Sequence, residues 1–177
     1  AHKMLMDNLV ETAGSWRNKN VGVLDGTKVK HVAPKPAFVP KLMNDLFGWL
    51  KNDTETHYLI KGAIVHYEIE FIHPFEDGNG RIHRFLIHDT LVRDGILVDG
   101  IIIPVSAYML NNLKEYDQTL EAYSKPLMKI ARYTKKETEE IEVTNPEEIE
   151  GYFRYPDLTS QCIFLARTIQ ATIQNEI

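Results

Sequence analysis

Two segments of this 177-residue chain are apolar on nearly every side of a helix, and they constrain the fold more than any other feature. The second runs from Gly80 to about Arg93. The first covers residues 55–72, with apolar side chains at helical spacing: Leu59, Ile60, Ala63, Ile64, Tyr67 and Phe71. A helix that is apolar all round is buried. We therefore expect these helices to pack together at the centre of a mainly helical domain.

The stretch between the two helices, within residues 71–84, concentrates reactive side chains on a short piece of backbone. Pro74 disfavours the right-handed helical conformation at His73, so the first helix is expected to end there. Gly78 and Gly80 allow backbone angles that other residues avoid. Successive N–H groups in such a turn can form a concave anion site.

The second helix begins beside this turn, so its free N–H groups and positive dipole end reach the same anion site. Arg81 and Arg84 share one face of its first turn. Two cations are unfavourable there, and either Glu76 and Asp77 or a bound phosphate chain is expected to offset them. Asp77 is placed to hold Mg²⁺, which typically takes one or two carboxylates plus substrate phosphates. His73 is the expected proton acceptor, since imidazole titrates near neutral pH.

Taken singly, each of these residues has an ordinary structural explanation, whereas together they predict a nucleotide site. The run His-Pro-Phe-Glu-Asp-Gly-Asn-Gly-Arg-Ile-His-Arg, from His73 to Arg84, resembles the Fic-domain signature His-x-Phe-x-Asp/Glu-Gly-Asn-Gly-Arg-x-x-Arg at every defining position. The resemblance implies a helical bundle with a small β-hairpin, the flap, over the active-site loop. It also implies a protein adenylyltransferase, an enzyme that transfers AMP from ATP to a Tyr, Thr or Ser hydroxyl of a target protein.

The resemblance assigns roles within the signature. His73 is the general base, Asp77 the Mg²⁺ ligand and Phe75 the anchor of the loop in the core. ATP is expected to bind at the following residues: Gly78, Asn79, Gly80, Arg81 and Arg84. Glu76 occupies a variable position and receives no role.

A second resemblance lies in a helix expected over about residues 106–123. In Fic domains an Asn followed four residues later by Tyr lies near the nucleoside, and Asn112 and Tyr116 have this spacing. The Arg that often follows the Asn is Leu113 here, and the common second Tyr is Asp117. An ordinary amphipathic helix therefore stays open as the alternative.

Other segments give simpler signals. Residues 2–13 are predicted to form a helix that Gly14 ends. Residues Val21–Val32 are predicted to form a hairpin with its turn at Asp25-Gly26, and this hairpin is either the flap or an ordinary surface hairpin. Pro40 is expected to open a further helix. Four histidines lack zinc-type spacing and are predicted to be satisfied or exposed helical residues rather than metal ligands: His57, His66, His83 and His88.

The predicted organisation is a catalytic domain over residues 1–132, a charged linker or helix end over 133–145, and a C-terminal helical extension over 146–177. The resemblance does not cover residues 133–177. The chain starts without Met and stops inside a helical pattern, so we expect a fragment trimmed at both ends. Cys162, the single cysteine, fits a reducing compartment, and the expected location is the cytoplasm. A net charge of −5 suggests no nucleic-acid binding, and no apolar run suggests a membrane span.

Three alternatives remain. Doc toxins, relatives of Fic domains, act as kinases and replace the second loop glycine with Lys, so Gly80 favours AMP transfer. The chain could also be a non-catalytic nucleotide-binding regulatory module, or part of a transcription regulator if a DNA-binding domain follows Ile177. The inhibitory motif of many Fic proteins, Ser/Thr-x-x-x-Glu-Gly/Asn, is not found in this sequence, which favours a de-repressed chain. The inhibitory element is expected upstream, on a separate inhibitory partner or not at all, and a homo-oligomer stays open.

Overall fold

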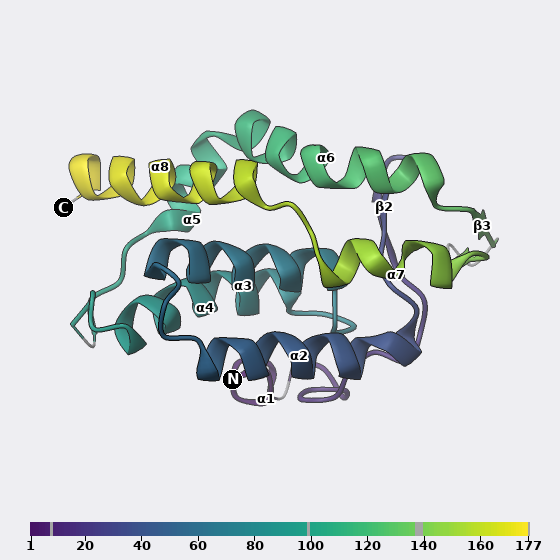
Figure 1. Ribbon diagram of the computed structural model, residues 1–177, viewed down its shortest axis with the longest axis horizontal. Coiled ribbons are helices and arrows are strands. Elements are labelled where there is room, and N and C mark those ends of the chain that lie inside the picture. Colours follow the sequence, from purple (N-terminus) through teal and green to yellow (C-terminus); the bar gives the residue numbers. More distant parts are fainter. Residues whose placement is uncertain (8, 99, 137–139, 177) are drawn as a thin grey trace.

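A computed structural model describes residues 1–7, 9–98, 100–136 and 140–176, and it is mostly helical with a small N-terminal hairpin, as predicted (Figure 1). The elements in chain order are α1 (His2–Met6), β1 (Gly22–Asp25), β2 (Lys28–Val32), a 3₁₀ turn (Pro36–Phe38), α2 (Val39–Asn52), α3 (Tyr58–Ile72), α4 (Asn79–Arg93), α5 (Val105–Asn111), α6 (Leu113–Ile130), β3 (Tyr133–Lys135), β4 (Ile141–Val143), α7 (Pro146–Arg154) and α8 (Thr159–Glu176). No helix in the described ranges is long and apolar enough to cross a membrane.

Helix α3 is the centre of the fold. Helix α4 packs along it, and α2, α7 and α8 contact its other sides (Figure 1). Its fully buried side chains accordingly fall all round the helix: Ala63, Val65, His66, Tyr67 and Ile69. The prediction of a central apolar helix is confirmed. Helix α4 is less enclosed, since Phe85 is 41% exposed.

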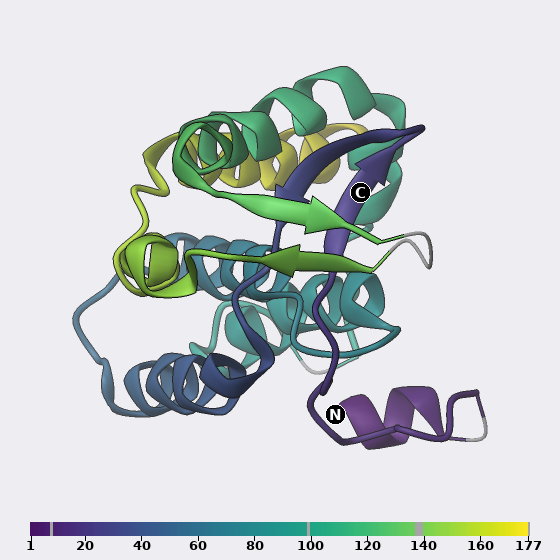
Figure 2. The same cartoon turned by 90° about the vertical axis from the view of Figure 1, so that its right-hand side faces the viewer.

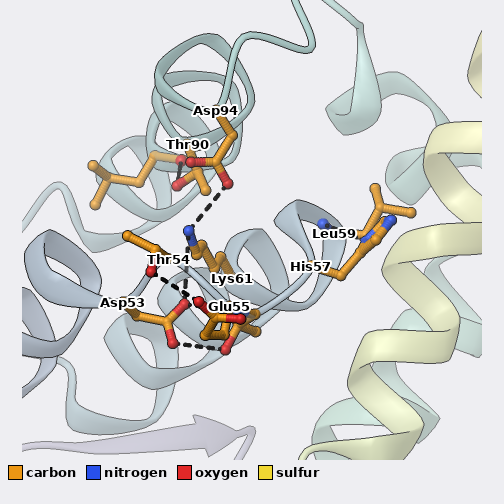
Figure 3. Close-up of polar contacts among 10 residues, drawn as sticks. Asp53, Thr54, Glu55, His57, Leu59, Lys61, Thr90 and Asp94 are labelled. Atoms are coloured by element: carbon orange, nitrogen blue, oxygen red, sulfur yellow. Dashed lines mark hydrogen bonds and ion pairs between the residues drawn. The ribbon is translucent and has the colours of Figure 1, made fainter.

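A buried lysine ties together the two helices that flank the loop between α3 and α4, and the end of α2. Lys61 of α3 is 6% exposed, and its ammonium lies 3.6 Å from Asp53 after α2 and 3.3 Å from Asp94 after α4 (Figure 3). A buried charge is tolerated only when it is paired. The ion pairs therefore hold the ends of α2 and α4 against the first turn of α3.

The predicted hairpin is present, with β1 and β2 antiparallel and Gly26 at φ +57° in the turn. The pairing register shifts between Val23 and Leu24. Strand β2 packs against α6. A second hairpin, formed by β3 and β4, lies across the first (Figure 2). The Ile141 side chain of β4 packs so closely against Gly22 of β1 that a Cβ added to Gly22 would lie 2.5 Å from it. This second hairpin occupies a segment for which the sequence suggested a helix end or linker.

The N-terminal helix is shorter than predicted. The sequence suggested a helix over residues 2–13, but α1 ends at Met6, and Leu5 and Leu9 are 38% and 61% exposed. His2 and Met6 are buried instead, four residues apart on one face. That face contacts the loop between α3 and α4, and this tertiary contact outweighs the apolar pattern of the longer segment.

The single helix expected over residues 106–123 is two helices. Asn112, with φ −125° and ψ 38°, interrupts the helical backbone between α5 and α6. The C-terminal helix α8 is present as predicted, and it finds its partner surface on α3, α5 and α6. The division into a catalytic domain, a linker and an extension stays a prediction.

Candidate active site

The candidate site begins where α3 ends. His73 has φ 50° and ψ 59° and is the only non-glycine with a positive φ among the described residues. Its N–H donates to the Ile69 carbonyl at 2.9 Å, which closes the last turn of α3. Such a conformation is strained for a residue with a Cβ and persists only when its surroundings enforce it. The predicted end of the helix before Pro74 is confirmed.

Arg17 supplies part of that enforcement. Its guanidinium is buried and donates to the carbonyls of His73 at 2.7 Å and Ile72 at 3.2 Å, two of the unpaired carbonyls at the end of α3. It also donates to Lys19 at 2.7 Å and Pro34 at 2.6 Å, which lie before β1 and after β2. One side chain thus ties both ends of the hairpin to the His73 turn.

Sequence reasoning missed Arg17. Burial lowers the pKa of its guanidinium to about 10, so the group stays charged at neutral pH. A cation at the carboxyl end of a helix is electrostatically favourable. The residue lies 56 positions before the turn it holds, so no local motif marks it.

The turn after His73 is closed by a side chain that the sequence assigned to ATP. Asn79 Oδ1 accepts from the Phe75 N–H at 3.0 Å, and Asn79 Nδ2 donates to the Phe75 carbonyl at 2.9 Å. Phe75 is buried and stacks on the His2 ring with centroids 3.6 Å apart. The prediction that Phe75 anchors the loop is confirmed. The Asn79 side chain has a structural role, which leaves its backbone amide for a ligand.

The loop opens into α4 with unpaired amides. Gly78, at φ +84°, is the N-cap, and the N–H groups of Asn79 and Gly80 have no acceptor inside the helix. Asp77 Oδ1 accepts from the Gly78 N–H at 2.6 Å. This geometry is that of an anion site with a carboxylate at its edge.

Charged side chains surround these amides. Asp77 Oδ2 lies 3.5 Å from Arg81 Nη2, and both side chains are about half exposed. The expectation that an acid offsets the arginines is met by Asp77, whereas Glu76 accepts from Thr12 at 3.2 Å. An exposed carboxylate beside free amides fits a cation such as Mg²⁺ that is shared with phosphate oxygens.

The second arginine lies on the other side of the amides. A Cβ added to Gly80 would lie 3.2 Å from Arg84 Nη1, so the missing side chain at position 80 leaves room for this guanidinium. Burial raises the pKa of the Tyr116 hydroxyl, Glu70 acts in the same direction, and the nearby charge of Arg84 acts against it. Arg84 therefore lies between the loop and α6.

The two residues expected near a nucleoside are placed differently. The Tyr116 hydroxyl lies 3.4 Å from Nε2 of the buried His66 and faces the α3–α4 pair. Asn112 Nδ2 donates to the Tyr108 carbonyl at 2.9 Å and caps α5 locally. The structure brings Tyr116 toward the signature residues, and no contact joins Asn112 to them among the residues that are described. Their roles at a nucleoside stay predictions.

A buried polar chain joins α3 to α4 beside the site. Glu70 Oε2 lies 2.9 Å from His83 Nε2, and His83 Nδ1 lies 2.9 Å from His66 Nδ1. The prediction that His66 and His83 are satisfied helical histidines is confirmed. Sequence reasoning did not single out Glu70. Its only local signal is the spacing of three residues to His73.

His73 itself is suited to accept a proton. Burial lowers the pKa of its imidazole, and Arg17 and His83 act in the same direction, while the Glu70 charge and the Glu70 carbonyl oppose the shift. The ring is therefore largely neutral at pH 7. Its Nδ1 is buried without a hydrogen-bond partner among the described residues.

Comparisons with known proteins agree with this geometry. The model of the Fic/DOC family matches residues 1–91, which is 91 of the 177 residues. A probable protein adenylyltransferase of Aquifex aeolicus is 41% identical over 59 residues, covering 33% of this chain and 18% of the relative. A protein adenylyltransferase Fic of Nematostella vectensis is 40% identical over 78 residues, covering 43% of this chain and 17% of the relative.

A solved structure extends the likeness over the whole fold. The crystal structure of a Fic family protein from Desulfovibrio desulfuricans superposes with a TM-score of 0.62 and 29% identity, covering 98% of this chain and 43% of that one. The chain thus spans less than a fifth of the length of the two curated relatives and less than half of the solved one.

Proposed function

The chain belongs to the Fic/DOC family, and we propose that it transfers AMP from ATP to a hydroxyl group of a target protein. One observation carries the proposal. The neutral imidazole of His73 is held in a left-handed turn that leads directly into an amide-lined helix N-terminus with an exposed Asp77. This places a base, an anion site and a cation ligand on eight consecutive residues. The names of the two curated relatives support the same reaction.

In the proposed reaction the acceptor hydroxyl attacks the α-phosphorus of ATP, the new O–P bond forms, and the bond to pyrophosphate breaks. His73 takes the hydroxyl proton as the bond forms. The amides of Asn79 and Gly80 bind phosphate oxygens, and Arg81 and Arg84 neutralise their charge. Asp77 would hold Mg²⁺, which supplies charge neutralisation on the phosphate oxygens when bound.

The hairpin is proposed as the flap that aligns the acceptor segment. A cavity of about 290 Å³ lies between β1–β2, the end of α3 and α6, and Glu70 and Phe71 are among its lining residues. Arg17 ties the hairpin to the His73 turn. An extended peptide beside the hairpin would therefore present a hydroxyl close to the base.

The Doc-like kinase alternative is disfavoured by the loop sequence, because Doc toxins carry Lys in place of the second loop glycine and this chain has Gly80. The non-catalytic nucleotide-binding module stays the second candidate, because fold and signature do not by themselves establish turnover.

Intact-mass spectrometry after incubation with Mg²⁺ and ATP tests the proposal, with His73→Ala and, as a control histidine on α4 outside the site, His88→Ala. We expect a gain of one AMP unit in the wild type and in His88→Ala, and none in His73→Ala. A gain of one phosphate instead would establish the kinase. The binding module would be established by two results together. All three forms would bind ATP equally, and none would transfer a group to itself or to the proteins of a lysate supplied with labelled ATP.

The remaining features of the whole protein stay predictions, because the chain spans a small part of its relatives. They include the target protein, a separate inhibitory partner or a homo-oligomer, and a location in the cytoplasm. The nucleoside contacts of Asn112 and Tyr116 belong with them.

A further inference from the structure

Glu70 is held by an unusually well-defined set of partners. Its carboxylate lies 2.9 Å from His83 Nε2, with the Glu70 side chain 20% exposed and the His83 side chain 4% exposed. The other ring nitrogen of His83 lies 2.9 Å from Nδ1 of His66, which is fully buried. The three side chains belong to the two central helices, so they form a rigid part of the core.

The hydrogen bonds of this chain end on the Glu70 carboxylate. Because a carboxylate only accepts, His83 Nε2–H donates to Glu70. The other ring nitrogen of His83 shares a hydrogen bond with His66 Nδ1, and His66 Nε2 lies 3.4 Å from the Tyr116 hydroxyl. Burial lowers the pKa of His66 well below its ordinary value, so this ring is neutral. The two histidines therefore fix the orientation of the Glu70 carboxylate.

The Glu70 carboxyl is charged at neutral pH. Burial by itself would raise its pKa, but the hydrogen bond from His83 outweighs burial and lowers the pKa below its ordinary value. Glu68, two residues earlier on the same helix, shows the contrast: burial raises its pKa to about 8. At pH 7 one glutamate of α3 is an anion and the other is largely a neutral acid.

The anion lies one helical turn before His73 and lines the cavity under the hairpin. The charged and titratable groups around the pair come from every neighbouring element: Arg17 from the N-terminal segment, His31 from β2, His66 from α3, His83 and Arg84 from α4, and Tyr116 and Asp117 from α6. Of those that act on His73, Arg17 and His83 disfavour its protonation and Glu70 favours it.

We propose that Glu70, oriented by His83 and His66, is a positioning residue that stabilises the imidazolium formed when His73 takes the proton of the acceptor hydroxyl. The proposal rests on the proposed AMP transfer for its role in the reaction. A base surrounded by positive groups gains a proton at a cost, and one fixed carboxylate nearby reduces that cost. The role resembles that of a carboxylate behind a catalytic histidine in general acid–base catalysis.

Glu70→Gln tests the proposal, and Glu68→Gln is the matched control, because the same substitution there removes a carboxyl that is already largely neutral below pH 8. The pKa of the His73 ring is measured by NMR titration of the free protein, and the acid limb of kcat/KM is measured for ATP-dependent transfer. In Glu70→Gln we expect the His73 pKa and the acid limb to fall by about one unit, with ATP affinity retained. Glu68→Gln is expected to shift neither.

Each outcome decides a separate point. An unchanged His73 pKa in Glu70→Gln, or an equal shift in both variants, would overturn the proposal. A lowered His73 pKa with an unmoved acid limb would overturn the role in the reaction. If the wild type transfers nothing, the proposed function fails, while the NMR titration still tests the interaction of Glu70 with His73. Should Glu70→Gln not fold, Glu70→Asp keeps the charge and is expected to retain most of the wild-type His73 pKa, and a loss there would count against the proposal.

Discussion

Removal of the Arg17 side chain is predicted to destabilise the domain and to loosen the His73 turn. In Arg17→Ala four carbonyls lose their donor, among them those of His73 at 2.7 Å and Pro34 at 2.6 Å. A hydrogen bond that involves a charged group contributes about 1.5–3 kcal/mol, so four such bonds contribute roughly 6–12 kcal/mol. The hairpin and the end of α3 would lose their common anchor.

The cost of burying the cation opposes this sum. Burial lowers the Arg17 pKa from 12.5 to about 10, which corresponds to about 3 kcal/mol against the charged form. Subtracting that cost from the lower end of the hydrogen-bond contribution leaves a net loss of about 3 kcal/mol on substitution. In a domain of this size that loss lowers Tm by roughly 6–12 °C.

Urea denaturation and thermal melting measure the loss, with Arg93→Ala as the control. The Arg93 side chain is 72% exposed and pairs with Asp89, so its removal is expected to change stability by less than about 0.5 kcal/mol. In folded Arg17→Ala at low temperature, AMP transfer is expected to fall more than ATP affinity, since the turn and not the amide site is disturbed. A loss of stability below about 1 kcal/mol, or equal losses in the two variants, would refute the reasoning.

Three further predictions concern the loop and the hairpin. Gly78 has φ +84°, and Gly78→Ala places a Cβ 2.6 Å from Met6 Sδ. Urea denaturation should show that this variant loses at least about 1 kcal/mol of unfolding free energy, and an unchanged free energy would contradict the prediction. Burial lowers the pKa of His31 to about 4 in the folded protein, below the value near 6.5 of the unfolded chain. Between these two pH values His31 is therefore protonated in the unfolded chain but not in the folded protein. Stability should therefore fall by about 3 kcal/mol as pH drops from 7 to 4, with a flatter dependence in His31→Gln, and equal slopes would disprove the assignment. Asn79→Ala removes both bonds to the Phe75 backbone and is expected to cost about 2 kcal/mol by thermal melting, whereas an unchanged Tm would show that the loop closes without them.

Local sequence sufficed for the scaffold of the site. Pro74 ends α3 at His73, and the Gly78–Gly80 turn starts α4, because these residues restrict or release the backbone angles of their immediate neighbours. The apolar pattern of residues 55–72 likewise predicted a buried central helix, since burial requires apolar side chains on every face. The family signature covers these same positions and assigned their chemistry.

Only the tertiary structure decided which distant residues hold that scaffold in place. Arg17 reaches a turn 56 positions away, and His2 contacts the Asp77 carbonyl 75 positions away, while no local pattern sets either residue apart. The same holds for the bond between Glu70 and His83 and for the short N-terminal helix, where contact of Met6 with the loop outweighed a longer helical pattern. Backbone preferences depend on neighbours in sequence, whereas hydrogen bonds and charge pairs depend on distance in space, which is known only once the helices have packed.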